Sequence, residues 1–212
     1  MPERSIDAVI FDFGGVLAAN GRASDFNAMV KPEHRGKVAH LMTGTPGTDT
    51  DHPWHRIERG EITLEEARVG YSALLAEAGI ELNPPSGAGK LVFRPNEPVV
   101  ALVHELKAAG FRLGVLTNNI KEFRDNWRSM LPFDELFDDI VDSHEVRMRK
   151  PNPAIYQLAL ARLGAEAGRT AFMDDMAANV EAAERVGMRG VVVDEDPGPA
   201  VATVRRWAGF SA

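Results

Sequence analysis

The chain opens on a short apolar run that no polar residue interrupts. Ala8, Val9, Ile10 and Phe11 are all apolar, and the pair Gly14-Gly15 follows closely. A strand that is buried on both faces of a parallel sheet reads in this way, because neither of its faces meets water. The pattern predicts an interior strand of an α/β domain.

From residue 97 onward, helical and strand patterns alternate regularly. The expected elements are a helix over 97–109 that ends at Gly110, a strand from Arg112 to Thr117, a helical stretch over 120–131, a strand near Asp139–Asp142, a helix that starts at Pro153 behind the N-cap Asn152 and stops before Gly164, a strand from Thr170 to Met173, a helix ending at Gly187, a strand from Gly190 to Val193 and a C-terminal helix. Such alternation indicates right-handed crossovers and a parallel sheet with helices on both faces.

Residues 20–95 have a different character. They carry helical stretches around 23–42 and 63–79 with a Gly/Thr/Asp-rich loop between them, and a Pro/Gly-rich stretch lies near their end. We interpret them as a small α-helical cap inserted after the first strand. Residues 1–19 and 96–212 would then form one discontinuous catalytic core.

Composition narrows the class of protein only a little. The hydrophobic fraction of 44% and the charged fraction of 26% are ordinary for a globular chain, and no apolar run approaches the roughly 20 residues of a membrane span. The absence of cysteine excludes disulfides, thiolate metal sites and a cysteine nucleophile. The net charge of -7 disfavours nucleic acid as a partner. We expect a cytoplasmic protein without a membrane partner, as a monomer or homodimer.

Polar residues with chemical uses follow several of the predicted strands. Asp12 follows the first strand, Thr117 and Asn118 the second, and the pair Asp174-Asp175 follows the strand from Thr170 to Met173; Lys150 lies in the loop before the helix at Pro153. In an open parallel sheet the carboxyl ends of the strands form the ligand site, so these side chains are expected to converge on one crevice. Alone, Asp12 would be a turn residue and Asp174-Asp175 a helix N-cap; together they favour a site.

The expected convergence points to phosphoryl chemistry with a hard cation. Carboxylates that repel one another need a positive charge, and all-oxygen ligands favour Mg²⁺. A carboxylate such as Asp12 can attack phosphorus, while Lys150 would neutralise the transferring group and Thr117 would hydrogen-bond a phosphoryl oxygen.

Four segments resemble the motifs of the haloacid dehalogenase superfamily, in the family's order and spacing. They are Ile10 to Leu17, Leu116-Thr117-Asn118-Asn119, Arg149-Lys150-Pro151, and Phe172-Met173-Asp174-Asp175 with Asn179. The similarity is greatest to the phosphatase subgroup that includes the N-terminal domain of soluble epoxide hydrolase, whose cap the stretch from Pro53 to Thr63 also resembles. The resemblance implies a Rossmann-like core and a helical cap.

The resemblance also implies roles for individual residues. Asp12 would be the nucleophile and a Mg²⁺ ligand, with the Gly14 carbonyl and Asp175 as the other protein ligands; Asp174 would stand behind the metal or share it. Asn179 would orient Asp175 or Lys150, and Asn118 would belong to the catalytic set. Gly15 and Asn119 are expected to contact the substrate, a small phosphorylated metabolite. In the cap, Trp54 is expected to be core, and His55 or Arg56 to face the substrate.

Two positions depart from the family pattern. The family's phosphatases usually carry an aspartate two residues after the nucleophile, which acts as general acid and base; in this chain that residue is Gly14. Arg147 occupies a place where members of the family often have glycine. Two other functions therefore stay open. A haloacid dehalogenase would use the same aspartate without metal, although by resemblance it replaces the acid pair Asp174-Asp175 by neutral residues. A pseudo-phosphatase would only bind a phosphorylated ligand.

Overall fold

In the computed structural model, residues 4–21, 27–45, 47–82 and 92–211 are described. Five parallel strands form one sheet in the order β3-β2-β1-β4-β5. Their bounds are β1 Ala8–Phe11, β2 Arg112–Thr117, β3 Asp139–Asp142, β4 Thr170–Asp174 and β5 Arg189–Val192. The predicted parallel α/β fold is confirmed, with β1 at the centre of the sheet as its uninterrupted apolar run requires.

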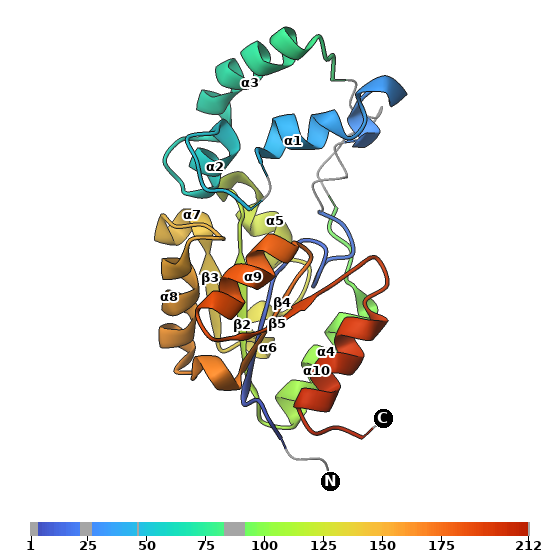
Figure 1. Cartoon of the computed structure of the whole chain (residues 1–212), viewed down its shortest axis with the longest axis vertical. Coiled ribbons are helices and arrows are strands. Elements are labelled where there is room, and N and C mark those ends of the chain that lie inside the picture. The colour runs from blue at the N-terminus through green and yellow to red at the C-terminus, as the bar shows by residue number, and fades with distance from the viewer. Residues whose placement is uncertain (1–3, 22–26, 46, 83–91, 212) are drawn as a thin grey trace.

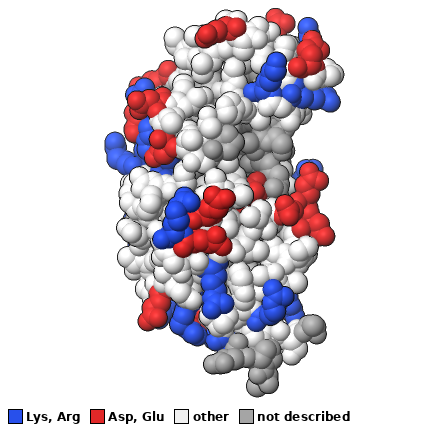
Figure 2. All heavy atoms as spheres, in the orientation of Figure 1, with Lys and Arg blue, Asp and Glu red and all other residues white. Residues whose placement is uncertain are grey.

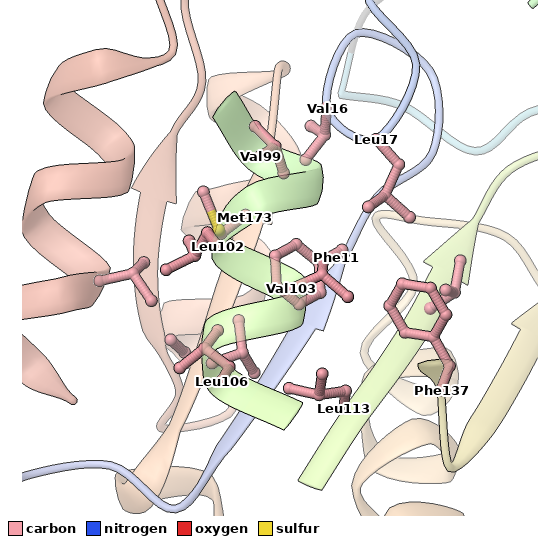
Figure 3. Packing of buried hydrophobic residues seen from close by; sticks show 14 of the residues in the cluster. Phe11, Val16, Leu17, Val99, Leu102, Val103, Leu106, Leu113, Phe137 and Met173 are labelled. Atoms are coloured by element: carbon pink, nitrogen blue, oxygen red, sulfur yellow. The ribbon is translucent and has the colours of Figure 1, made fainter. Parts of the chain in front are cut away.

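Helices cover both faces of this sheet (Figure 1). One face packs on α4 (Glu97–Ala108), α10 (Gly198–Trp207), α5 (Arg124–Arg128) and α6 (Phe133–Leu136), and the other on α8 (Pro153–Leu163) and α9 (Ala177–Arg185). In Figure 3, Phe11, Leu113 and Met173 of three strands lie against four apolar side chains of α4: Val99, Leu102, Val103 and Leu106. Burying one apolar side chain of this size contributes about 1.5–3 kcal/mol to the stability of the fold. The apolar cores on both faces therefore hold the strands, and with them the strand ends, in place.

Three helices lie beyond the carboxyl ends of the strands (Figure 1), and we call them the cap helices: α1 (Lys37–Thr43), α2 (Pro53–Glu58) and α3 (Leu64–Ala78). They pack around small apolar clusters of their own, one of which also takes in Ile120 from the core. Helix α3 confirms the expected helix over 63–79. Thr63 and Glu66 form a capping box at its start, and Gly79 ends it in the left-handed conformation with φ of 66°. The domain boundaries at residues 19 and 96 stay a prediction.

The expected helix over 23–42 was wrong in its extent. Residues 22–26 lie outside the described residues, and the described remainder holds 3₁₀ turns at 27–29 and at η2 (Pro32–His34) and the short α1. Pro32 cannot continue a preceding helix, and Gly36, with φ of 81°, interrupts the helical conformation before α1 begins. Helix α2 was not predicted, because six residues are too few to show a helical period.

The helical stretch over 120–131 also divides. It becomes the 3₁₀ turn η3 (Lys121–Phe123) and α5, and α6 begins after Pro132. A one-turn helix that the sequence did not suggest, α7 (Ser143–Val146), follows β3 and ends at Arg147, whose φ is 56°. Glycine is the residue that this left-handed conformation favours, since a side chain in it costs on the order of 1 kcal/mol or more. A further 3₁₀ turn, η4 (Ala167–Arg169), leads into β4.

Candidate active site

The carboxyl ends of β1 and β4 bring three acids together. Phe11 and Met173 are register partners in these neighbouring parallel strands, and the Asp12 amide donates to the Met173 carbonyl at 2.8 Å. Asp12, Asp174 and Asp175 each have a carboxylate oxygen within 4.8 Å of the other two. The convergence that was expected from the strand ends is therefore present for these acids.

Lys150 lies between two of the three carboxylates. Its Nζ is 2.7 Å from Asp12 Oδ1, 2.7 Å from Asp174 Oδ2 and 3.0 Å from the Leu116 carbonyl oxygen, and only 1% of its side chain is exposed. Burial alone would lower the pKa of Lys150, but the carboxylates of Asp12 and Asp174 hold that pKa above its usual value. The side chain is therefore a fixed positive charge beside Asp12.

One lysine does not neutralise this cluster. Burial, together with the negative charges of Asp174 and Asp175, raises the pKa of Asp12 to about 8, although Lys150 acts in the opposite direction. Three carboxylates facing one ammonium leave an excess of negative charge, which a divalent cation would compensate. The available ligands are carboxylate oxygens, which suit Mg²⁺. Asp12 and Asp175 are the side chains expected to hold the ion.

Asp174 is held by hydrogen bonds to both of its carboxylate oxygens. Its Oδ1 accepts from the Met176 amide at 2.8 Å, and Asn179 Nδ2 donates to its two oxygens at 3.1 and 3.2 Å. Asn179 thus has a partner that the resemblance did not name. The hydroxyl of the buried Tyr156 donates to the Asn179 carbonyl at 3.0 Å and so holds the backbone of that residue. With Lys150 also bound to Asp174, this carboxylate serves to fix the lysine.

Asn118 holds the backbone on which Lys150 stands. Its Nδ2 donates to the Lys150 carbonyl at 3.0 Å, and the Lys150 amide donates to Asn118 Oδ1 at 2.8 Å. The buried Asn119 accepts from the Ile120 amide through its own side chain. Thr117 is buried at the end of β2. Direct substrate contact by these residues stays a prediction.

The loop after β1 is tightly folded around Gly14. A Cβ on Gly14 would lie 2.9 Å from the carbonyl oxygen of Gly21, closer than real Cβ atoms come to backbone. Gly15 has φ of 76°, in the region that favours glycine. Metal ligation by the Gly14 carbonyl and substrate contact by Gly15 stay predictions.

The two proposed substrate-binding residues of the cap differ in their surroundings. His55 is buried, its Nδ1 accepts from the Thr50 amide at 3.0 Å, and its Nε2 lies 3.0 Å from the Thr43 carbonyl. One ring nitrogen is therefore bonded to the last residue of α1 and the other to the loop that follows it. Arg56 is 44% exposed and forms an ion pair with Glu61 at 3.4 Å. A contact of either residue with substrate stays a prediction.

A buried ion pair that the sequence did not predict joins cap and core. Arg149 Nε donates to Glu58 Oε2 at 2.7 Å, and the two side chains are 9% and 7% exposed. Trp54 Nε1 donates to the other oxygen of Glu58 at 2.7 Å. The only sequence signal was a glutamate four residues after a tryptophan, which places both on one side of a helix.

The surface carries charges of both signs. Figure 2 shows small groups of Lys and Arg beside groups of Asp and Glu on the face drawn, so the described residues there form no continuous basic area. Within the described ranges, none of the helices has the length and apolar character needed to cross a bilayer.

Comparison with known proteins gives a consistent family. Residues 6–187 match the model of the haloacid dehalogenase-like hydrolases. The chain is 31% identical to acyl-CoA dehydrogenase family member 10 of Mus musculus, over 98% of this chain but only 20% of that protein. It is 28% identical to the sesquiterpene phosphatase astK of Aspergillus oryzae, over 87% of this chain and 88% of the relative. Bifunctional epoxide hydrolase 2 of Mus musculus is 32% identical over 86% of this chain, which spans 35% of that protein.

Solved structures share the fold at low identity. An enzyme of Bacteroides thetaiotaomicron in complex with magnesium and inorganic phosphate superposes with a TM-score of 0.61 at 18% identity, over 90% of this chain and 96% of its own. The L-2-haloacid dehalogenase RSc1362 superposes with a TM-score of 0.64, also at 18% identity, over 95% of this chain and 99% of its own. The match of the family model over most of the chain shows that the protein belongs to the haloacid dehalogenase-like hydrolases.

Proposed function

We propose that the protein is a Mg²⁺-dependent phosphatase that hydrolyses a small phosphorylated metabolite through an aspartyl-phosphate on Asp12. The observation that carries this proposal is the cluster of Asp12, Asp174 and Asp175 around Lys150. Such a cluster needs a cation, and Asp12 is a nucleophile beside a fixed ammonium. We also assign residues 20–95 as the cap of this enzyme.

The proposed hydrolysis has two chemical steps, and residues of this chain act in both. Asp12 attacks phosphorus, the bond from phosphorus to the leaving oxygen breaks, and its electron pair goes to that oxygen. Water then attacks the aspartyl-phosphate, which releases phosphate and restores the carboxylate. Lys150 balances charge on the phosphoryl oxygens while Asp174 and Asn118 hold it in place. Mg²⁺, when bound, lowers the repulsion between Asp12 and an anionic substrate.

The relatives support this reaction over dehalogenation. Sesquiterpene phosphatase astK and the Mycobacterium tuberculosis phosphatase MT3486, which is 29% identical over 90% of this chain, are both named as phosphatases. The dehalogenase structures resemble this chain at 18–19% identity, which informs on fold alone.

A three-way assay tests the proposal. Purified protein with Mg²⁺ should release phosphate from p-nitrophenyl phosphate and from members of a panel of phosphorylated metabolites, and excess EDTA should stop the release. Halide release from 2-chloropropionate in EDTA would identify a dehalogenase instead. Binding of inorganic phosphate without turnover of any phosphate ester would identify a phospho-ligand-binding protein.

A further inference from the structure

The residue before Lys150 belongs to the core but makes its strongest contacts with the cap. Arg149 is 8% exposed, and its Nε donates to Glu58 at the end of α2. Glu58 is equally buried and is held from the other side by Trp54, one helical turn earlier. Both members of the pair are therefore fixed in direction as well as in position.

Arg149 also reaches a second part of the cap. Its NH1 donates to the Thr48 carbonyl and lies 3.8 Å from Asp49 Oδ1. Asp49 is itself bound by Arg59, the residue after α2. One guanidinium thus joins α2 to the loop that precedes it, which a single ammonium group could not do because its donors do not form a planar fork.

On its other side, Arg149 is bonded through one peptide to the catalytic lysine. The Lys150 backbone is clamped by Asn118, and Lys150 Nζ lies between Asp12 and Asp174. A shift of the Arg149 backbone therefore moves the lysine out of a geometry in which each contact is 2.7 Å. The dipeptide Arg149-Lys150 therefore connects the position of the cap to the geometry of the phosphoryl site.

The ion pair between Glu58 and Arg149 is better suited to fixing the position of the cap than to stabilising the protein. A buried ion pair is not an efficient source of stability, because desolvation offsets its attraction and a well-packed apolar pair often does as well. The pair does impose one geometry, since burying either the Glu58 carboxylate or the Arg149 guanidinium without its partner would be costly. Both groups become hydrated again if the cap moves away from the core, so the contact is reversible.

We propose that Glu58 and Arg149 are positioning residues of the phosphoryl site, which seat the cap in the one arrangement that leaves Lys150 between Asp12 and Asp174. The inference rests on the proposed phosphatase function. It implies that a cap residue without substrate contact controls the affinity of the site for phosphate.

Glu58→Gln is the primary test, because it keeps the shape and the acceptor for Trp54 but removes the charge that holds Arg149. We expect inorganic phosphate, titrated calorimetrically with Mg²⁺ present, to bind about 10–100-fold more weakly, as is typical when a residue that orients a ligating group is lost. The KM for p-nitrophenyl phosphate should rise in parallel. Mg²⁺ binding without phosphate should not weaken, since Asp12 and Asp175 are untouched and a lysine farther from Asp12 leaves more negative charge there. A merely structural defect would weaken the binding of both ligands.

Two further variants make the test decisive. Glu105→Gln is the matched control, because Glu105 pairs with Arg205 between two core helices, and it should leave phosphate affinity at the wild-type value. If Glu58→Gln fails to fold, the double variant Glu58→Gln/Arg149→Met removes both charges and avoids a lone buried guanidinium. It should fold and show the same weak phosphate binding.

Wild-type phosphate affinity and KM in a folded Glu58→Gln protein, or in the double variant, would overturn the positioning role and leave the phosphatase function intact. Failure of the wild-type protein itself to bind phosphate or to turn over phosphate esters would instead overturn the proposed function, and this inference with it.

Discussion

We expect the position two residues after Asp12 to determine which leaving groups the proposed phosphatase can expel. Gly14 offers no proton donor, and the Gly21 carbonyl lies where a side chain would begin, 2.9 Å from an ideal Cβ. Phosphoryl transfer with a loose transition state places negative charge on the leaving oxygen. A well-placed acid that protonates this oxygen is typically worth about 10²–10⁴-fold in rate, or about 3–5 kcal/mol of barrier.

The titratable residues of α2 and its N-cap do not replace the missing acid. His52 accepts from the Trp54 amide through Nδ1 and has its Nε2 3.2 Å from the Leu41 carbonyl, and both ring nitrogens of His55 are similarly bonded. Glu58 accepts from Arg149. None of the three has a proton to give without breaking a contact that holds the cap together.

Poor leaving groups should therefore react slowly. We expect log kcat/KM to fall steeply as the pKa of the leaving group rises across a series of aryl phosphates. Acyl phosphates and sugar phosphates linked at the anomeric carbon should exceed glycerol phosphate by about the 10²–10⁴-fold that acid catalysis normally supplies. A flat plot for the unmodified protein would refute the reasoning, because it would mean that another group donates the proton.

Restoring the carboxylate at this position should not succeed. In Gly14→Asp and Gly14→Ala the new Cβ must displace the backbone at Gly21, and forcing atoms into a packed site costs about 1–3 kcal/mol. Both variants should melt below the wild type in differential scanning calorimetry. A Gly14→Asp protein of wild-type stability that flattened the leaving-group plot would show that the loop moves aside without cost.

Three other results are expected. Asp12→Asn should keep the fold and lose turnover, and substantial phosphate release by the folded variant would exclude the covalent mechanism. Ca²⁺ in place of Mg²⁺ should lower kcat, because Ca²⁺ takes more ligands at about 2.3–2.6 Å instead of about 2.0–2.1 Å; equal rates with both ions would contradict an in-line geometry set by the metal. Burial, with the charges of Arg149 and His52, lowers the pKa of His55 to about 4. The unfolded chain takes up this proton near pH 6.5 and the folded chain does not, so the unfolding free energy should fall as pH drops from about 6.5 to about 4. That dependence should shrink in His55→Gln, measured by urea unfolding at each pH, and persist in a variant of the exposed His104.

The core was predictable because its signals are local. An uninterrupted apolar run identifies a central parallel strand, and the residue after it must lie at the edge of the sheet where ligands bind. This rule is enough to bring Asp12 and Asp174 together, as the structure confirms. Errors occurred where single residues override a periodic pattern, as Pro32 and Gly36 do in the stretch before α1.

The contacts that hold the site in place were not predictable in the same way. Glu58 and Arg149 are 91 positions apart, and nothing in either local pattern says that they meet. The same holds for the partner of Asn179, because a residue one turn past an acid pair can reach more than one neighbour. Local rules specify which groups reach the crevice, whereas tertiary contacts specify how far each can move within it.

This division has a consequence for substrate choice. Of the groups that we propose to act on phosphorus, Asp12 and Asp174 lie at strand ends, where the sheet sets the position of the backbone. By our proposal the orientation of the cap depends on the buried pair of Glu58 and Arg149, which a single substitution can remove. Relatives that share the four core segments can therefore keep the same phosphoryl chemistry and differ in the substrate they accept, because changes in the cap move the walls of the crevice without moving the nucleophile.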